Sequence, residues 1–388
     1  MEIDPKIGAE RTGTGCLLVD FERKRSRGIV LRGSHGSCYS NGGNQRIFRP
    51  GGQTGRKTGP TRNRPGLAAG ANPSRPLLTI KEVFVTMPIS RLMDACADSI
   101  ASRSLADGGF TGRERGDFRP DATAWAAMGL SAAGRREDLA EAARDRLVSL
   151  QAEDGRISMS PEIPQAFWPT SLAILAWSPS PRHREPRERA TRFLLATTGL
   201  HFENTFKFAW GHDTTIKGWP WIGDTHSWVE PTSLALIALR SQALSGHDRA
   251  AEARRMIMDR QIKEGGWNYG NNYILGKYLR PMPESTGLAL TALAGKVEEA
   301  AVENSVNYLE EVLPRMRTPI SLGWSLIGLA SWNRTPGNGE DLVNVCLERQ
   351  AVFGAYDTQQ LALMLVTLVA LERRQPPFPE GADGERRS

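Results

Sequence analysis

The side chains best suited to chemistry gather in one stretch of the chain, between Phe208 and Thr232. It contains two histidines, three carboxylates and four tryptophans: His212, His226, Asp213, Asp224, Glu230, Trp210, Trp219, Trp221 and Trp228. An apolar aromatic setting raises the pKa of a carboxyl group enough for it to act as an acid near neutral pH. Aromatic faces can also stabilise a cation. We therefore predict Asp224, His226 and Glu230 as catalytic groups and the four tryptophans as substrate contacts.

Glu284 and two tyrosines complete the predicted site. Glu284, like Glu230, lies beside a proline at the start of an expected apolar helix, and we predict it as a fourth catalytic group. Tyr273 and Tyr278 lie in the preceding loop and are predicted to contact substrate. The alternative is that the acids at helix starts only cap the helices and complement their dipoles. Those acids are Asp121, Glu230, Glu284 and Asp357.

A metal site is a weaker reading of the same residues. His212, Asp213, Asp224 and His226 could hold zinc or iron, because both metals accept imidazole together with carboxylate ligands. Their spacing matches no metal motif, so we expect neither a bound metal nor a cofactor. The 4 cysteines are too few and too scattered for a disulfide scaffold or a cysteine-type zinc site. We therefore predict a protein of the reducing cytoplasm.

Repeated helical hairpins are the elements that must position these groups. Charged amphipathic helices are expected at residues 90–104, 137–151, 186–198, 248–262, 297–312 and 340–350. More apolar helices are expected at 121–133, 168–177, 231–244, 284–295, 320–332 and 357–373. A single hairpin cannot bury its apolar face, so its copies must stack. The sequence therefore predicts an all-α fold, an α/α toroid of six hairpins with the apolar helices inside.

The long connections all lead from a charged helix to an apolar helix. In the first four repeats they cover residues 105–120, 152–167, 199–230 and 263–283. In a ring of like-oriented hairpins, these loops emerge at the end where the apolar helices begin. Structured loops gathered at one rim commonly carry function. We therefore place the candidate site at this mouth, above an apolar interior.

The charge of the chain is unevenly distributed. Residues 1–86 hold 15 basic and 6 acidic residues, whereas the rest of the chain holds 34 basic and 37 acidic residues. We predict a disordered, basic, Gly-rich tail at 1–86, whose true start could be Met87, a toroid at 87–374 and a flexible tail at 375–388. The folded body is not basic, so no nucleic-acid partner is expected. The longest apolar run, Leu361 to Leu371, is too short to span a membrane. Peripheral membrane contact and the oligomeric state stay open.

Short motifs before the apolar helices resemble a known superfamily. Gln261 to Trp267 fits the pattern Q-x(2–5)-G-x-W, the QW motif, and Gln151 to Gly155 is a degenerate copy. With the recurring Pro-Thr-Ser-Leu-Ala helix starts, residues 88–374 resemble the squalene cyclase and protein prenyltransferase superfamily of α/α toroids. The resemblance implies a central cavity that binds or transforms an isoprenoid-like apolar molecule. It also implies that Trp267 and Tyr269 pack between hairpins.

The chain departs from the chemistry of that superfamily. It has no Asp-x-Asp-Asp acid motif, and no cysteine lies near the start of an apolar helix to build the zinc site of the prenyltransferases. Three functions therefore stay open. The first is an enzyme of isoprenoid chemistry, and the second is a non-catalytic ring that binds a lipid or a protein. The third is a carbohydrate-active α/α barrel, in which Asp224 and Glu284 could supply the two carboxylates that sugar cleavage needs.

Overall fold

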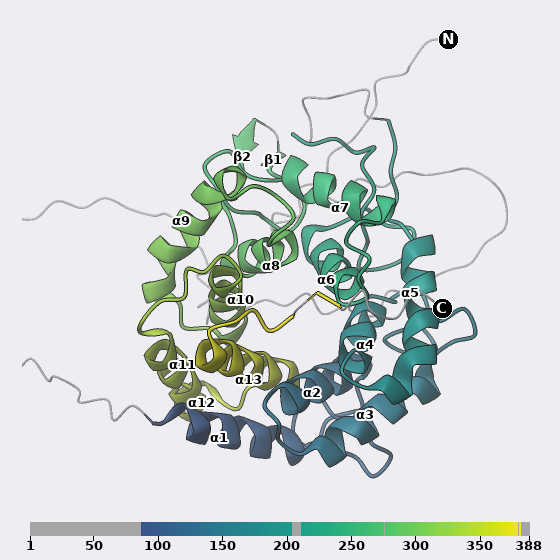
Figure 1. Ribbon diagram of the computed structural model, residues 1–388, viewed down its shortest axis with the longest axis vertical. Helices are drawn as coiled ribbons and strands as arrows, with labels where there is room; N and C mark the ends of the chain where they lie inside the picture. Colours follow the sequence, from purple (N-terminus) through teal and green to yellow (C-terminus); the bar gives the residue numbers. More distant parts are fainter. Residues whose placement is uncertain (1–86, 204–210, 275, 379, 382–388) are drawn as a thin grey trace, which may run out of the picture. The chain divides into compact units, whose positions relative to one another are not determined.

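The computed structural model describes residues 87–203, 211–274, 276–378 and 380–381 (Figure 1). The tail predicted at 1–86 and Trp210 lie outside the described residues. Within the described ranges, no helix combines the length and the apolar character needed to cross a membrane.

The described helices form two concentric rings (Figure 1). The inner ring consists of α2 (Pro120–Ala132), α4 (Pro169–Trp177), α6 (Val229–Arg240), α8 (Pro283–Leu293), α10 (Pro319–Ala330) and α13 (Thr358–Arg373). Each of these helices contacts the next, and α13 contacts α2, so the inner ring is closed. The predicted α/α toroid is confirmed.

An outer helix covers each inner helix. The outer helices are α1 (Ile89–Ala101), α3 (Glu137–Leu150), α5 (Arg184–Ala196), α7 (Asp248–Asp259), α9 (Glu303–Val312) and α11 (Gly339–Glu348). Short elements complete the described chain: η1 (Pro181–His183), η2 (Glu299–Ala301), η3 (Leu313–Arg315), α12 (Gln350–Phe353) and an antiparallel pair of strands, β1 (Tyr273–Ile274) and β2 (Lys277–Tyr278). The long connections precede α2, α4, α6 and α8, as the sequence predicts.

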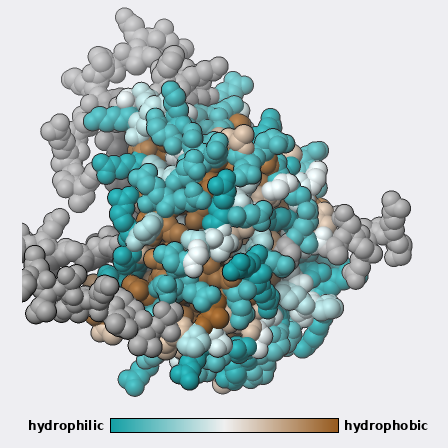
Figure 2. Space-filling model, turned by 60° about the vertical axis from the view of Figure 1, so that its left-hand side comes forward, coloured by the Kyte–Doolittle hydropathy of each residue, from teal (hydrophilic) through white to brown (hydrophobic). Residues whose placement is uncertain are grey.

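The two rings differ in composition because they differ in environment. All residues of α4 are buried, whereas α5 buries only one face. A helix enclosed on every side is apolar all round, and a helix facing water is amphipathic. On the flank drawn in Figure 2, the described surface is mainly hydrophilic, with hydrophobic residues visible between the polar ones.

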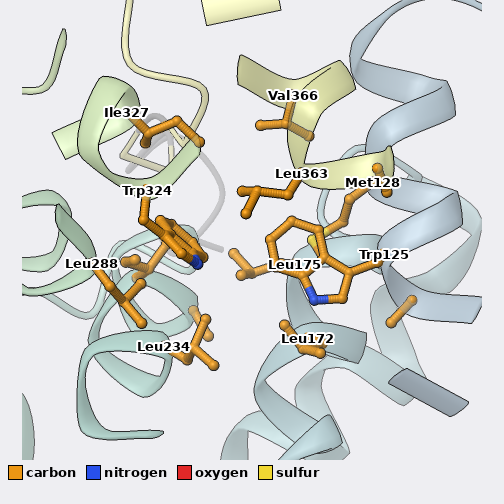
Figure 3. Close-up of a cluster of buried hydrophobic side chains, with 14 of the residues drawn as sticks. Trp125, Met128, Leu172, Leu175, Leu234, Leu288, Trp324, Ile327, Leu363 and Val366 are labelled. Atoms are coloured by element: carbon orange, nitrogen blue, oxygen red, sulfur yellow. The ribbon is translucent and has the colours of Figure 1, made fainter. Parts of the chain in front are cut away.

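The interior of the inner ring is filled with apolar side chains (Figure 3). The indole rings of Trp125 and Trp324 meet edge to face, with centroids 5.9 Å apart, although α2 and α10 are separated by α13 in the ring. The side chains labelled in Figure 3 come from all six inner helices, and none is more than 6% exposed. The apolar interior expected from the sequence is present, and side chains occupy it.

One hydrogen bond recurs at the start of four inner helices. A threonine hydroxyl oxygen accepts the backbone N–H of a buried residue in the preceding loop. The pairs are Thr123 with Phe110 (2.9 Å), Thr170 with Ile157 (2.9 Å), Thr232 with Trp219 (2.9 Å) and Thr286 with Trp267 (3.0 Å). The four loop residues are at most 2% exposed, and the last of them, Trp267, ends the QW motif. Trp267 therefore packs between helices, as the resemblance implies.

The glycines of these motifs allow each loop to touch the next hairpin. Gly155 and Gly265 have φ of +96° and +109°, where side chains are disfavoured. A Cβ at either position would lie 2.4 Å from a carbonyl oxygen of the next outer helix, that of Arg189 in α5 or that of Asn304 in α9. Neighbouring hairpins are thus locked together at the QW motifs.

The described residues that follow α13, 374–378 and 380–381, cross one end of the ring (Figure 1), the end at which α6 finishes. The ring of Phe378 lies 6.4 Å from that of Trp324. The Glu380 carboxylate accepts a hydrogen bond from Lys296 Nζ (2.8 Å), and Gly381 N–H donates to the carbonyl of Arg240, the last residue of α6 (3.0 Å). The described part of the segment predicted as a flexible tail is therefore bound to the ring.

Candidate functional site

Two glutamates occupy equivalent places at the mouth of the ring. Glu230 and Glu284 are the second residues of α6 and α8, and neither side chain caps its own helix. Each accepts a hydrogen bond from the following inner helix instead. Ser285 Oγ donates to Glu230 Oε1 (2.9 Å), and Ser321 Oγ donates to Glu284 Oε2 (2.8 Å). Two separate hydrogen bonds therefore connect α6 with α8 and α8 with α10, and their members on α8, Glu284 and Ser285, are adjacent in the chain.

Tyr269 joins this pair from the fourth long loop. Its hydroxyl donates to Glu284 Oε1 (3.2 Å), and its carbonyl accepts the N–H of Val229, the first residue of α6 (2.9 Å). Its side chain is 42% exposed. Tyr269 thus lies at the mouth, and the expectation that it packs between hairpins like Trp267 is wrong. The sequence does contain a signal for the position of Tyr269 at the mouth, because Tyr269 follows the buried Trp267 by two residues.

The surroundings of Glu230 and Tyr269 raise the pKa values of both side chains to different levels. Burial raises the pKa of Glu230 to about 7; the Ser285 hydrogen bond opposes this rise, and the charge of Glu284 adds to it. Burial raises the pKa of the Tyr269 phenol to about 12, and the charges of Glu284 and Glu230 contribute. Near neutral pH, Glu230 can therefore gain or lose a proton while Tyr269 remains a hydrogen-bond donor.

The other two acids at helix starts have structural partners. Asp121 is 1% exposed and accepts two hydrogen bonds from Arg119, at Oδ1 (2.9 Å) and Oδ2 (2.6 Å). Asp357 caps α13: its Oδ1 accepts the N–H of Gln360 (2.8 Å), and the Gln360 side chain accepts the N–H of Asp357 (2.9 Å). Capping and pairing therefore explain these two residues but not Glu230 and Glu284.

A tryptophan, Trp168, occupies the equivalent place directly before α4. Asp121, Trp168, Glu230 and Glu284 each stand two residues before a recurring threonine. Since α4 lies between α2 and α6 in the ring, Trp168 lies between Asp121 and Glu230 along the rim. Its ring meets that of Trp221 edge to face, with centroids 5.3 Å apart. Trp221, predicted as a substrate contact, is therefore joined to the rim through a residue that sequence reasoning missed.

Two predicted catalytic residues lie apart from the glutamate pair. Asp224 and His226 are exposed on the third long loop, and no interaction within the described ranges links either to Glu230 or Glu284. Asp224 has a φ of +60°, and the His226 ring packs 5.6 Å from that of Phe202. Within the same ranges, no three His, Cys, Asp or Glu side chains are arranged to hold a metal ion.

The predicted aromatic contacts also divide. Trp219 is 2% exposed, its Nε1 donates to the carbonyl of Leu194 (2.9 Å), and Arg249 covers its ring at 4.4 Å. Trp219 is therefore part of the core and cannot reach a ligand at the mouth. Trp228 is 37% exposed, and Tyr273 and Tyr278 pair across the β1–β2 hairpin with ring centroids 5.1 Å apart. These three remain available at the surface.

Known structures share the fold of this chain. No family model matches the sequence, and no curated protein sequence matches it. A type II terpene cyclase from Scytonema, in complex with geranylgeranyl dihydroxybenzoate, aligns with 13% identity and a TM-score of 0.53 over 74% of this chain and 98% of the cyclase. An inactive variant of an α-1,6-mannanase from Salegentibacter sp. HEL1_6, in complex with α-1,6-mannotriose, aligns with 12% identity and a TM-score of 0.52 over 74% and 100%.

A protein from Actinoplanes aligns with 16% identity and a TM-score of 0.50 over 74% of this chain and 99% of its own. At such identities the likeness establishes the α/α toroid and nothing about the reaction. The inactive mannanase variant carries replacements of two adjacent aspartates. This sequence contains no two adjacent aspartates.

Proposed function

We propose that this toroid is an enzyme that cleaves a glycosidic bond at the mouth of the ring, with Glu230 as the proton donor and Glu284 as the second carboxylate. The observation that carries the proposal is the placement of two glutamates on neighbouring inner helices, each oriented by a serine of the next helix. Glycosidic cleavage needs two carboxyl groups in different protonation states. The pair expected from the sequence, Asp224 with Glu284, is replaced in this proposal by Glu230 with Glu284.

The environments of the two glutamates suit different roles. Glu230, with a pKa of about 7, holds a proton in much of the population near neutral pH and can deliver it to a leaving oxygen. Glu284 accepts hydrogen bonds from Tyr269 and Ser321, and these two donors fix the direction of its carboxylate. In the proposed reaction this carboxylate attacks the anomeric carbon or activates a water molecule.

The surroundings favour a substrate that lies across the rim. Trp221 and Trp168 are half-buried beside Glu230's helix, and Trp228 is partly exposed two residues before Glu230. Aromatic side chains give rigid apolar faces on which the apolar face of a sugar ring can rest. Since side chains fill the ring below, we place the substrate over the mouth and not inside the ring.

Binding of an isoprenoid-like molecule is the second candidate. The apolar lining of the ring, with the aromatic rings of Trp125 and Trp324, favours it. Such a ligand would have to displace these side chains, because they already occupy the interior. A third possibility is a ring that binds a lipid or a protein without catalysis. It predicts no turnover of any substrate, with or without Glu230 and Glu284.

A substrate panel with matched variants tests the proposal. The full chain is incubated with oligosaccharides and aryl glycosides, and the release of reducing ends or phenol is measured. We expect Glu230→Gln and Glu284→Gln to lower turnover by about 100-fold or more, since general acid–base catalysis contributes on this scale. Glu264→Gln, an exposed glutamate of the fourth loop, is the control and should retain activity. Cleavage of no glycoside, together with saturable binding of geranylgeraniol, would favour the second candidate.

A further inference from the structure

A pocket lies beside the mouth, between the third long loop, the end of α7 and residues 270–271. The lining residues that matter for its chemistry are Phe202, His212, His226, Trp228, Arg260 and Asn271. The pocket is therefore lined by basic and amide side chains together with aromatic side chains. In the proposed function none of these residues is assigned to bond cleavage.

Arg260 is a buried cation with few partners. It is 5% exposed, and among the described residues its side chain forms one hydrogen bond, from Nη1 to the carbonyl of Ser227. Nε has no acceptor, and Arg260 forms no ion pair within the described part of the chain. Its neighbour Asp259 instead accepts the N–H of Asp213 (2.8 Å). The Asp259 carboxylate attracts this charge but forms no ion pair with it, so part of the cost of burying the guanidinium remains, and the site is suited to an anion supplied by a ligand.

The other pocket residues support an anion with a ring attached. The side-chain amide of Asn271 forms no hydrogen bond with any described residue and can donate to a ligand. His212 and His226 line the same space. Trp228 lies against Gly270, where an added Cβ would be 3.0 Å from the indole, so the absence of a side chain lets the indole lie on the backbone. A flat aromatic wall is thereby presented next to the cationic group.

The pocket and the mouth share short stretches of backbone. Trp228 precedes Glu230 by two residues, and Gly270 follows Tyr269 directly. The hydrogen bond from Val229 N–H to the Tyr269 carbonyl (2.9 Å) joins the two stretches. A ligand group held at Arg260 would therefore belong to a molecule that can also reach Glu230 and Glu284.

We infer that this pocket binds the anionic group of an acidic sugar, a carboxylate or a phosphate, with the Arg260 guanidinium facing the anion and Trp228 facing the sugar ring. A guanidinium can present two parallel N–H donors to either group. The sugar part of this inference rests on the proposed function, whereas the anion part rests on the pocket alone.

Calorimetric titration of the full chain tests the inference. Sodium glucuronate and glucose 6-phosphate are the two anionic probes, and glucose is the neutral one. We expect at least one anionic probe to bind about tenfold more tightly than glucose, since one charge-assisted contact accounts for a difference of this size. The probe that binds more tightly identifies a carboxylate or a phosphate as the preferred group. Equal affinity for all three probes, or no binding of either anion, would overturn the inference.

Variants separate this pocket from other basic sites. Arg260→Gln should remove the preference for the anionic probe. Arg240→Gln should keep it, because Arg240 is also buried with one carbonyl acceptor, Thr291 O, but lies at the far end of the ring. Wild-type affinity in folded Arg260→Gln would contradict the inference.

A second variant guards against misfolding of Arg260→Gln. Asn271 is partly exposed, so Asn271→Asp should fold normally while placing a negative charge in the pocket. We expect about tenfold weaker binding of the anionic probe and unchanged binding of glucose, and unchanged anion affinity would count against the pocket. Glu230→Gln should retain anion binding even if the proposed catalysis fails, so the two proposals can fail separately.

Discussion

Ser285 of α8 donates a 2.9 Å hydrogen bond to the carboxylate of Glu230 on α6. The bond crosses between neighbouring inner helices at the mouth, and a partly buried acid thereby gains a fixed direction. Ser321 holds Glu284 in the same manner one helix further on, so each acid is oriented by the next inner helix, and Tyr269 of the fourth loop adds a second donor to Glu284.

The raised pKa of Glu230 predicts a pH-dependent stability. The pKa is about 7 in the folded protein and 4.5 in the reference state, so the folded state binds the proton more tightly. Stability should therefore fall as the pH rises from about 4.5 to 7. Glu230→Gln should remove this loss and be more stable than the wild type at pH 8, by on the order of 2 kcal/mol. Denaturant unfolding of both proteins at pH 5 and pH 8 measures the difference. An equal difference at both pH values would contradict the assignment.

Tyr269→Phe should separate function from stability. The substitution removes one donor to Glu284 from a side chain that is 42% exposed. We expect turnover to fall by about tenfold and the free energy of unfolding to change by less than about 1 kcal/mol. Kinetics on the substrate that the glycoside panel identifies, together with denaturant unfolding, provide the check. A loss of stability of several kcal/mol with intact turnover would make Tyr269 a structural residue.

Thr232 should stabilise the fold through its hydroxyl. Thr232→Val keeps the shape but leaves the buried N–H of Trp219 without an acceptor. The expected cost is about 1–3 kcal/mol, and Thr232→Ser should recover most of it. Chemical denaturation of the three proteins compares them. Equal stability of the valine and serine variants would show that the hydroxyl is dispensable.

Phe378 should hold the C-terminal segment against the ring. Phe378→Ala removes the contact with Trp324 and should lower the free energy of unfolding by about 1–2 kcal/mol. Phe353→Ala is the matched control, because Phe353 is 69% exposed and should be nearly neutral. Thermal unfolding monitored by tryptophan fluorescence reports both. Similar thermal midpoints for the two variants would mean that the segment adds little.

The fold was predictable because its determinants are local. The predicted helix at 357–373 is observed at Thr358–Arg373, and the caps and apolar runs that define it lie within it. The helix predicted at 297–312 begins only at Glu303, because the residues before it form the 3-10 turn Glu299–Ala301. Charge patterning alone does not separate such a turn from a helix start.

The site was less predictable because its partners are distant in sequence. Glu230 and Asp224 look equivalent as acids beside tryptophans, but only Glu230 meets Ser285, which is 55 residues away in the chain. Trp219 and Trp221 look equally suited to ligand contact, but Trp219 turns into the core beside Arg249. Which of these residues can form a site depends on how deeply each is buried and on which helices are neighbours. Both properties follow from the closure of the ring.

The threonine hydrogen bonds have a consequence for how such a ring can diverge. The interval between each threonine and its bonded residue is 13 positions in the first three loops and 19 in the fourth. Extra sequence in the fourth loop, including the β1–β2 hairpin, is therefore accommodated between two fixed points without moving the helices. A loop held at two fixed points can change in length and sequence without disturbing the inner helices. Specificity at the mouth can therefore change while the sequence of the inner helices stays the same.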